Sequence, residues 1–153
     1  MIIAADSSDS MKGDEAQKEL VTRYVAAVNA KDTGKLKELV HPKCLAAITD
    51  ETRSFYDFIF LSEFKQTIPD GYKVRVNAVR QDQLDSMVGF ATFPIQPTHT
   101  IQVEWFPTPN NTQARVIFAV QDGGKWFDVL PVPTAETLQR FRTKKETEQR
   151  PAQ

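Results

Sequence analysis

The sequence has little cysteine, little histidine and no long hydrophobic run, and each shortage excludes a class of protein. Its 153 residues contain one cysteine, Cys44, which excludes an intrachain disulfide and a cysteine-rich metal site. The two histidines lie far apart without the spacing of metal ligands. The longest apolar runs, such as residues 58–61, are far shorter than the roughly 18 residues of a membrane span. We therefore expect no metal, no cofactor and no membrane span.

An excess of charge of one sign is also lacking. There are 19 basic and 20 acidic residues, giving a net charge of −1, and no stretch forms a basic stripe. Nucleic acids and anionic lipids need such a stripe, so neither is expected as a partner. With 41% hydrophobic and 25% charged residues, the composition is typical of a folded globular protein. The length fits one domain.

The ends of the chain differ from the middle. Residues 1–10 form a short apolar stretch followed by serine and aspartate, which fits either the remnant of a processed signal peptide or a frayed terminus. The protein would be exported in the first case and cytoplasmic in the second. We predict a flexible tail at 1–13, a domain at 14–133, a C-terminal helix at 134–148 and a second tail at 149–153.

Three segments of the first half have the apolar spacing of helices. Residues 14–30 carry one continuous apolar stripe, and a short helix containing Leu36 and Leu39 follows and ends before Pro42. Residues 52–67 form the third predicted helix. It ends at residues 68–71, where proline and glycine are typical of a turn.

The second half changes to an alternating pattern, which predicts strands with one buried face. The pattern covers residues 74–78, 98–105, 114–121 and 126–132, and in the third strand it favours Val116 and Phe118 as inward residues. Asp122-Gly123-Gly124 between the last two strands predicts a tight hairpin. Residues 82–93 are predicted as an irregular strand and loop. Helices followed by an antiparallel sheet indicate the α+β class.

This order of elements resembles the nuclear transport factor 2-like superfamily, also described as SnoaL-like or as the cystatin-like α+β cone. The resemblance is carried by residues 21–32, by Leu36 and Leu39, and by the hairpin at 122–126, and it covers roughly residues 14–132. It implies N-terminal helices packed in the concave face of a curved, mainly antiparallel sheet, with a conical pocket at the open end. It also implies a homodimer formed through the outer sheet face. The short C-terminal helix is additional.

The first predicted helix is similar to that of ketosteroid isomerase, a member of this superfamily. There the helix tyrosine donates a hydrogen bond to the developing enolate, and Tyr24 stands at the matching position. The reaction also needs a carboxylate base after the second helix and a protonated acid beside the tyrosine. Asp50 lies near the first of these positions, and Val116 occupies the second. Valine cannot donate a hydrogen bond, which favours a protein without catalysis.

Several polar residues have both a functional and a structural interpretation. His99 lies on an apolar strand face and fits either a general base or a packed, hydrogen-bonded histidine. Tyr24 fits either a hydrogen-bond donor in a site or a core residue with its hydroxyl at the rim. Asp57 and Glu63, on the third helix, would have raised pKa values if they faced inward, and they would otherwise form its wet side.

The aromatic content indicates a ligand site, because apolar pockets are the usual setting for small molecules. The candidate pocket residues are Tyr24, Phe55, Phe58, Ile59, Trp105, Val116 and Phe118. The leading hypothesis is a binding protein for a small apolar or amphipathic ligand, without catalysis. The alternatives are an isomerase or lyase that uses Tyr24 with Asp50 or His99, and an interaction or dimerisation module without a ligand.

Overall fold

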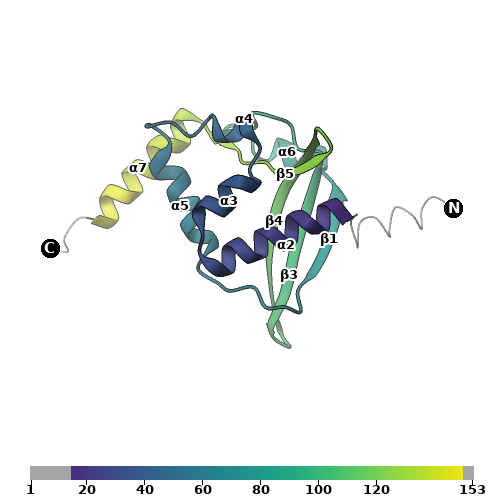
Figure 1. Ribbon diagram of the computed structural model, residues 1–153. Helices are drawn as coiled ribbons and strands as arrows, with labels where there is room; N and C mark the ends of the chain where they lie inside the picture. Colours follow the sequence, from purple (N-terminus) through teal and green to yellow (C-terminus); the bar gives the residue numbers. More distant parts are fainter. Residues whose placement is uncertain (1–14, 150–153) are drawn as a thin grey trace.

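The protein is described here by a computed structural model, in which residues 15–149 are placed (Figure 1). The predicted tail at 1–13 lies outside this range, as does the predicted tail at 149–153 except for Gln149, which is helical. The described chain is α+β, as the sequence predicts, with six helices and an open four-stranded antiparallel sheet of order β1-β3-β4-β5. Strands β2 and β6 form a separate two-stranded sheet. In the described range no helix is both long and apolar enough to cross a membrane.

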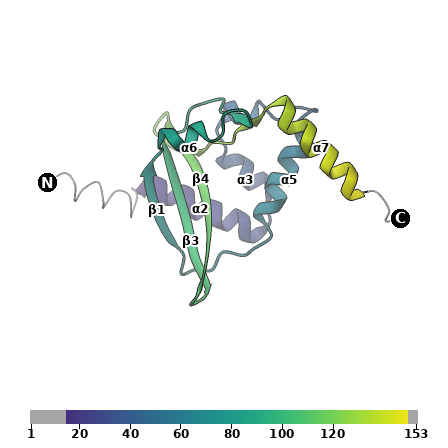
Figure 2. The same cartoon turned by 180° about the vertical axis from the view of Figure 1, so that it is seen from behind.

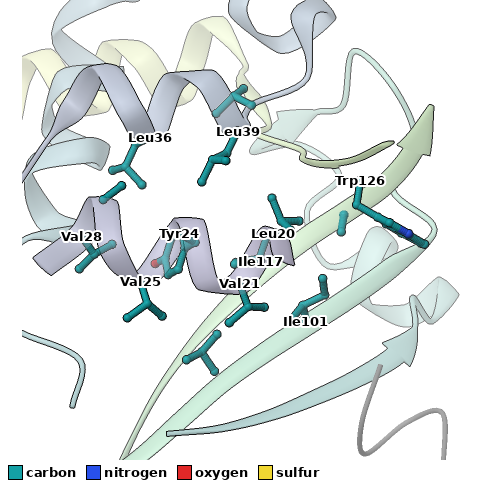
Figure 3. Close-up of a cluster of buried hydrophobic side chains, with 14 of the residues drawn as sticks. Leu20, Val21, Tyr24, Val25, Val28, Leu36, Leu39, Ile101, Ile117 and Trp126 are labelled. Carbon is teal, nitrogen blue, oxygen red and sulfur yellow. The ribbon is translucent and has the colours of Figure 1, made fainter. Parts of the chain in front are cut away.

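Helix α2 (Glu15–Ala30) is the first described element and covers one face of the main sheet. It crosses in front of the sheet in Figure 1 and behind it in Figure 2, whereas no long described helix lies on the opposite face. Its apolar stripe is buried against the sheet, where Val21 and Val25 lie near Ile101 and Ile117 (Figure 3). Each such side chain contributes roughly 1.5–3 kcal/mol by burial. This stripe was the strongest helical signal in the sequence.

Helix α3 (Thr33–Leu39) begins with a side-chain cap. The carboxylate of Asp32 accepts a hydrogen bond from the Lys35 amide at 3.1 Å, satisfying one of the unpaired donors at the helix start. Pro42 has a different role from the predicted one. It stands in the first turn of α4 (Pro42–Leu45), where its missing N–H costs nothing, and His41 is the N-cap of that helix.

Helix α5 (Arg53–Glu63) is shorter than the predicted 52–67. The Phe64 amide donates a hydrogen bond to the Leu61 carbonyl at 3.1 Å, and the Lys65 amide donates one to the Ser62 carbonyl at 3.4 Å. These i to i−3 bonds tighten the last turn and end the helix. Glu63 therefore lies at the carboxyl end of α5, close to the end of α2 (Figure 1).

The main sheet is formed by β1 (Lys73–Ala78), β3 (His99–Thr108), β4 (Asn111–Asp122) and β5 (Lys125–Asp128). The predicted hairpin joins the last two, with φ of +61° at Gly123 and +79° at Gly124, as a type I′ turn requires. Glycine reaches these angles without the steric cost of a side chain.

The inward face of β4 is the opposite of the predicted one. Ile117 pairs with Ile101 of β3, and residues paired directly across an antiparallel sheet share a face. Odd-numbered residues, including Arg115, therefore face α2, and Val116 is 55% exposed on the outer face. The prediction failed because β4 has apolar residues at both its even-numbered and its odd-numbered positions. Its own alternation therefore does not select the inward face, and pairing with β3 decides it.

Residues 82–93 contain a helix that the sequence pattern did not predict. Helix α6 (Gln81–Asp85) begins where the Gln83 side chain accepts a hydrogen bond from the Arg80 amide at 2.8 Å. Strand β2 (Ala91–Thr92) then pairs with β6 (Val132–Pro133), which overlaps the predicted last strand only at Val132. Five helical residues are too few to show a periodic stripe.

The predicted C-terminal helix is present as α7 (Ala135–Gln149). It lies on the side of α5 away from the sheet in both views (Figures 1 and 2). Phe141 of α7 packs against α5. The centroid of its ring lies 5.4 Å from that of Phe55 and 5.5 Å from that of Phe58. The Arg142 guanidinium also donates a hydrogen bond to the carbonyl of Glu51 at 2.9 Å.

Candidate functional site

Four polar side chains interact beside the apolar core, three of them by direct contacts and Asp128 through its charge. Tyr24 comes from α2, Glu63 from the end of α5, Arg115 from the inward face of β4 and Asp128 from β5. These four residues are called the polar cluster. Their elements are distant in sequence, so the fold rather than a local motif assembles them.

Tyr24 is the centre of the cluster. It is 3% exposed, and its hydroxyl donates a hydrogen bond to the Glu63 carboxylate. The pKa of Tyr24 lies far above its usual value, chiefly because of burial and then because of the charge and hydrogen bond of Glu63. Asp128 raises this pKa further and Arg115 lowers it, so both groups act on the same hydroxyl. Tyr24 therefore remains a protonated donor across the physiological pH range.

Asp128 is the acid of the cluster. Burial is the largest cause, and the charge of Glu63 the second, of a rise in its pKa from 3.8 to about 8. Its main chain is fixed by the register with Ala119 of β4 and by a hydrogen bond of 2.9 Å from the His41 amide to its carbonyl. Near pH 7 its carboxyl group is mostly neutral and can donate a hydrogen bond.

Arg115 connects the cluster to the surface. Its Nε lies 4.0 Å from Oε2 of Glu63, and Nη2 donates a weak hydrogen bond to the carbonyl of Ser62 at 3.5 Å. Nε itself is buried and has no hydrogen-bond partner. The side chains of Arg115 and Glu63 are 26% and 27% exposed, so water or a solute reaches this side of the cluster.

The arrangement holds an acid and a carboxylate close together. A neutral Asp128 can donate a proton, and the carboxylate of Glu63 can accept one. A carboxyl group whose environment strongly raises its pKa, as at Asp128, is typical of sites that bind or transfer protons. The same groups can also hold a carbonyl or hydroxyl group of a ligand by hydrogen bonds.

The predicted catalytic partners of Tyr24 are not beside it. The side chain of Asp50 is fully exposed and pairs with Arg53 at 3.3 Å. His99 is half-buried, bonds to the Thr98 hydroxyl at 2.8 Å and packs edge-on against Trp126 at 5.1 Å. Figure 3 shows Trp126 beyond Leu20, away from Tyr24. Within residues 15–149, no hydrogen bond or ion pair joins Asp50 or His99 to the Tyr24 hydroxyl.

The apolar pocket candidates fall into different environments. Trp105 is buried in the core, and Phe55 and Ile59 pack against its edge. Phe58 is exposed beside α7, and Val116 is exposed on the outer sheet face. Phe118 faces outward too and is half-buried, with its ring 5.3 Å from that of Phe93. These seven candidates therefore do not line one common surface.

His41 has a structural position at the start of α4. Its Nδ1 accepts a hydrogen bond from the Lys43 amide at 3.0 Å, and its Nε2 lies 2.7 Å from Oδ2 of Asp122. Because Nδ1 accepts from the Lys43 amide, Nε2 is the ring nitrogen that donates to Asp122. The hydrogen bond between His41 and Asp122 connects the start of α4 to the β4–β5 hairpin.

Sequence reasoning considered Glu63 but missed Arg115 and Asp128. Arg115 was assigned to the solvent face, because the inward face of β4 was inverted. Asp128 gave one usable signal: it stands two residues after Trp126 in the same strand, and residues at that spacing share a face. A carboxylate in phase with a buried tryptophan indicates an inward acid.

No group of three or more metal-ligating side chains occurs in the part of the chain that the structure describes. Comparison with known proteins gives no assignment: no family model, no curated protein and no solved structure matches this chain. The function is therefore argued from the polar cluster itself.

Proposed function

We propose that the protein binds a small amphipathic molecule in a cone-shaped hollow at the open end of the sheet, with the polar cluster holding the polar end of the ligand. The observation that carries the proposal is Asp128, a carboxyl group held neutral next to a buried tyrosine and a carboxylate. A neutral acid is a hydrogen-bond donor, which suits a ligand carbonyl or hydroxyl oxygen. Partly buried apolar side chains, such as Ile59 and Leu130, would contact the apolar part.

Burial and access together support a hollow at this place. Burial is the main cause of the raised pKa of Asp128, yet the residue keeps part of its surface exposed. The neighbouring Glu63 and Arg115 are each about three-quarters buried. We infer that groups which are both deep and reachable border a recess, because a group on the convex surface would keep its water.

A thermal-shift experiment tests this proposal on the full chain. Cyclic ketones of increasing size are compared with the hydrocarbons of the same shape. A ketone that saturates the site should raise the melting temperature by roughly 2–4 °C or more, since binding to the native state alone stabilises it. The hydrocarbons should have a smaller effect, and the ketone shift should disappear in Asp128→Leu and Tyr24→Phe, because neither new side chain can donate a hydrogen bond.

The matched control is Asp70→Leu, which makes the same change at an exposed aspartate in the 68–71 turn. This variant should keep the full ketone shift. Equal shifts for ketones and hydrocarbons, or full shifts in Asp128→Leu and Tyr24→Phe, would contradict a role for the polar cluster. A chain stabilised by none of the compounds would favour the alternative of an interaction module without a ligand.

An isomerase or lyase is the second candidate, and the neutral acid beside a carboxylate favours it. In this form Glu63, rather than Asp50 or His99, takes a proton from the carbon next to a ligand carbonyl, while Asp128 donates to the oxygen. The Val116 argument against catalysis loses its basis, because Asp128 is near Tyr24 and Val116 is not. Exchange of that ketone proton in D2O, followed by NMR, should then be catalysed by the natural chain and not by Glu63→Gln. Binding without exchange would exclude catalysis of this kind.

A homodimer through the outer sheet face is also proposed. No long described helix covers this face, and Val116 is exposed on it. An exposed valine in the middle of a sheet is a suitable contact for a second copy.

A further inference from the structure

A separate recess lies between the start of α2 and the β4–β5 hairpin. Its walls include Glu19, Leu20 and Arg23 from the helix and Lys125 and Trp126 from the hairpin, and its volume is about 280 Å³. It is named the hairpin recess. Small-molecule sites usually measure about 300–1,000 Å³, so this one would take a small ligand. Figure 3 shows Leu20 and Trp126 at the end of the core opposite Val28.

Trp126 brings an unsatisfied donor to the hairpin recess. The residue is 7% exposed, and its indole Nε1 is buried without a hydrogen-bond partner. A buried donor without an acceptor costs about 1–3 kcal/mol. A ligand oxygen that accepted this hydrogen bond would recover that cost, whereas an apolar ligand would not.

The charges around the hairpin recess have a net positive sum. Arg23 forms no ion pair or side-chain hydrogen bond with any residue in 15–149. The Lys125 ammonium lies 5.2 Å from the ring of Phe127 and also has no carboxylate partner there. Among the described residues that line the recess, Glu19 is the one acidic group, so two positive charges face one negative charge. This balance suits one negative charge better than the nearly two of a phosphate ester.

We propose that the hairpin recess binds a small monocarboxylate with an apolar body. The carboxylate accepts from the Trp126 indole and pairs with Arg23 at the rim, while the body rests against Leu20 and the indole ring. The recess is distinct from the polar cluster and does not depend on the function proposed for it.

An NMR titration of the full ¹⁵N-labelled chain with benzoate tests this site. The chain has two tryptophans, so it gives two indole N–H signals, which Trp105→Phe assigns. The Trp126 signal should move downfield and saturate with benzoate, and the Trp105 signal should stay in place. Benzamide, which has the same shape without the charge, should bind at least about tenfold more weakly if the charge contributes 1.4 kcal/mol. Inorganic phosphate should not produce a saturating shift.

Charge variants make the test specific. Arg23→Gln should weaken benzoate binding about threefold to tenfold, and Glu19→Gln should strengthen it, because each changes the charge at the rim. Arg53→Gln, an exposed arginine on α5, is the matched control and should leave the affinity unchanged. A Trp126 signal that does not move overturns the proposal. Equal binding of benzamide, or an unchanged affinity in Arg23→Gln, overturns it as well.

Discussion

Asp128 has a raised pKa, and its ionisation therefore makes the stability of the protein depend on pH. Its pKa is about 8 in the folded chain and should be near 3.8 when the chain is unfolded. The folded state therefore holds the proton more tightly. The stability that this gives is fully present below about pH 4 and is lost as the pH rises through about 8.

Asp128→Asn should remove this pH dependence. Relative to the natural chain, the variant should gain stability between pH 5 and pH 9, because asparagine keeps the shape and never ionises. The gain should be a few kcal/mol and at most about 6 kcal/mol, at about 1.4 kcal/mol for each pH unit of pKa difference. Urea unfolding at several pH values measures it. The free energy of unfolding of Asp70→Asn should change with pH as it does in the natural chain. If the curve of Asp128→Asn against pH ran parallel to that of the natural chain, the raised pKa would be contradicted.

Tyr24→Phe should lower the free energy of unfolding by about 1–3 kcal/mol, because Glu63 loses a hydrogen bond in a partly buried place. The urea midpoint at constant slope measures this loss. Tyr72→Phe is the control, since the Tyr72 hydroxyl has no hydrogen bond within the described residues. A loss no larger than that of Tyr72→Phe would show that the Tyr24–Glu63 bond is not formed in solution.

Elements with strong local signals were predictable from the sequence. The stripe of α2 and the double glycine of the β4–β5 hairpin each dictate their structure through nearby residues. Helix α6 was missed because a five-residue helix has no stripe. The face of β4 was inverted, since both parities carry apolar residues and only pairing with β3 selects one.

At the level of the helix, the cap of α3 gives a direct test. Asp32→Ala should cost about 0.5–2 kcal/mol of stability, because the Lys35 amide loses its acceptor. Thermal or urea unfolding measures the loss. Glu38→Ala, on the exposed side of the same helix, should change the stability by less than about 0.5 kcal/mol. Equal effects of the two substitutions would contradict the cap.

The polar cluster belongs to the scale of the whole molecule. Tyr24 and Glu63 could be named as candidates from the sequence, but their contact could not, because 39 residues separate them. Arg115 and Asp128 are brought to the same place only by the way in which β3, β4 and β5 pair in the sheet. Asp50 was the candidate base because of its position along the sequence, but it is exposed beside Arg53.

The outer face of the sheet offers a test of assembly. Val116→Glu should convert the proposed dimer to a monomer, because it places a charge in the middle of the contact. Sedimentation velocity at several protein concentrations measures this change. Leu61→Glu, at an exposed apolar residue of α5, should leave the dimer intact. A natural chain that is monomeric at every concentration would contradict the dimer.

The titration of Asp128 tests the account most directly. Its side-chain carboxyl carbon can be followed by ¹³C NMR in the full chain between pH 3 and pH 10. We expect its chemical shift to change with a midpoint near 8. A midpoint near 4, the ordinary value for aspartate, would mean that the carboxylate is charged and hydrated at neutral pH, and the polar cluster would then not be a buried site with a neutral acid.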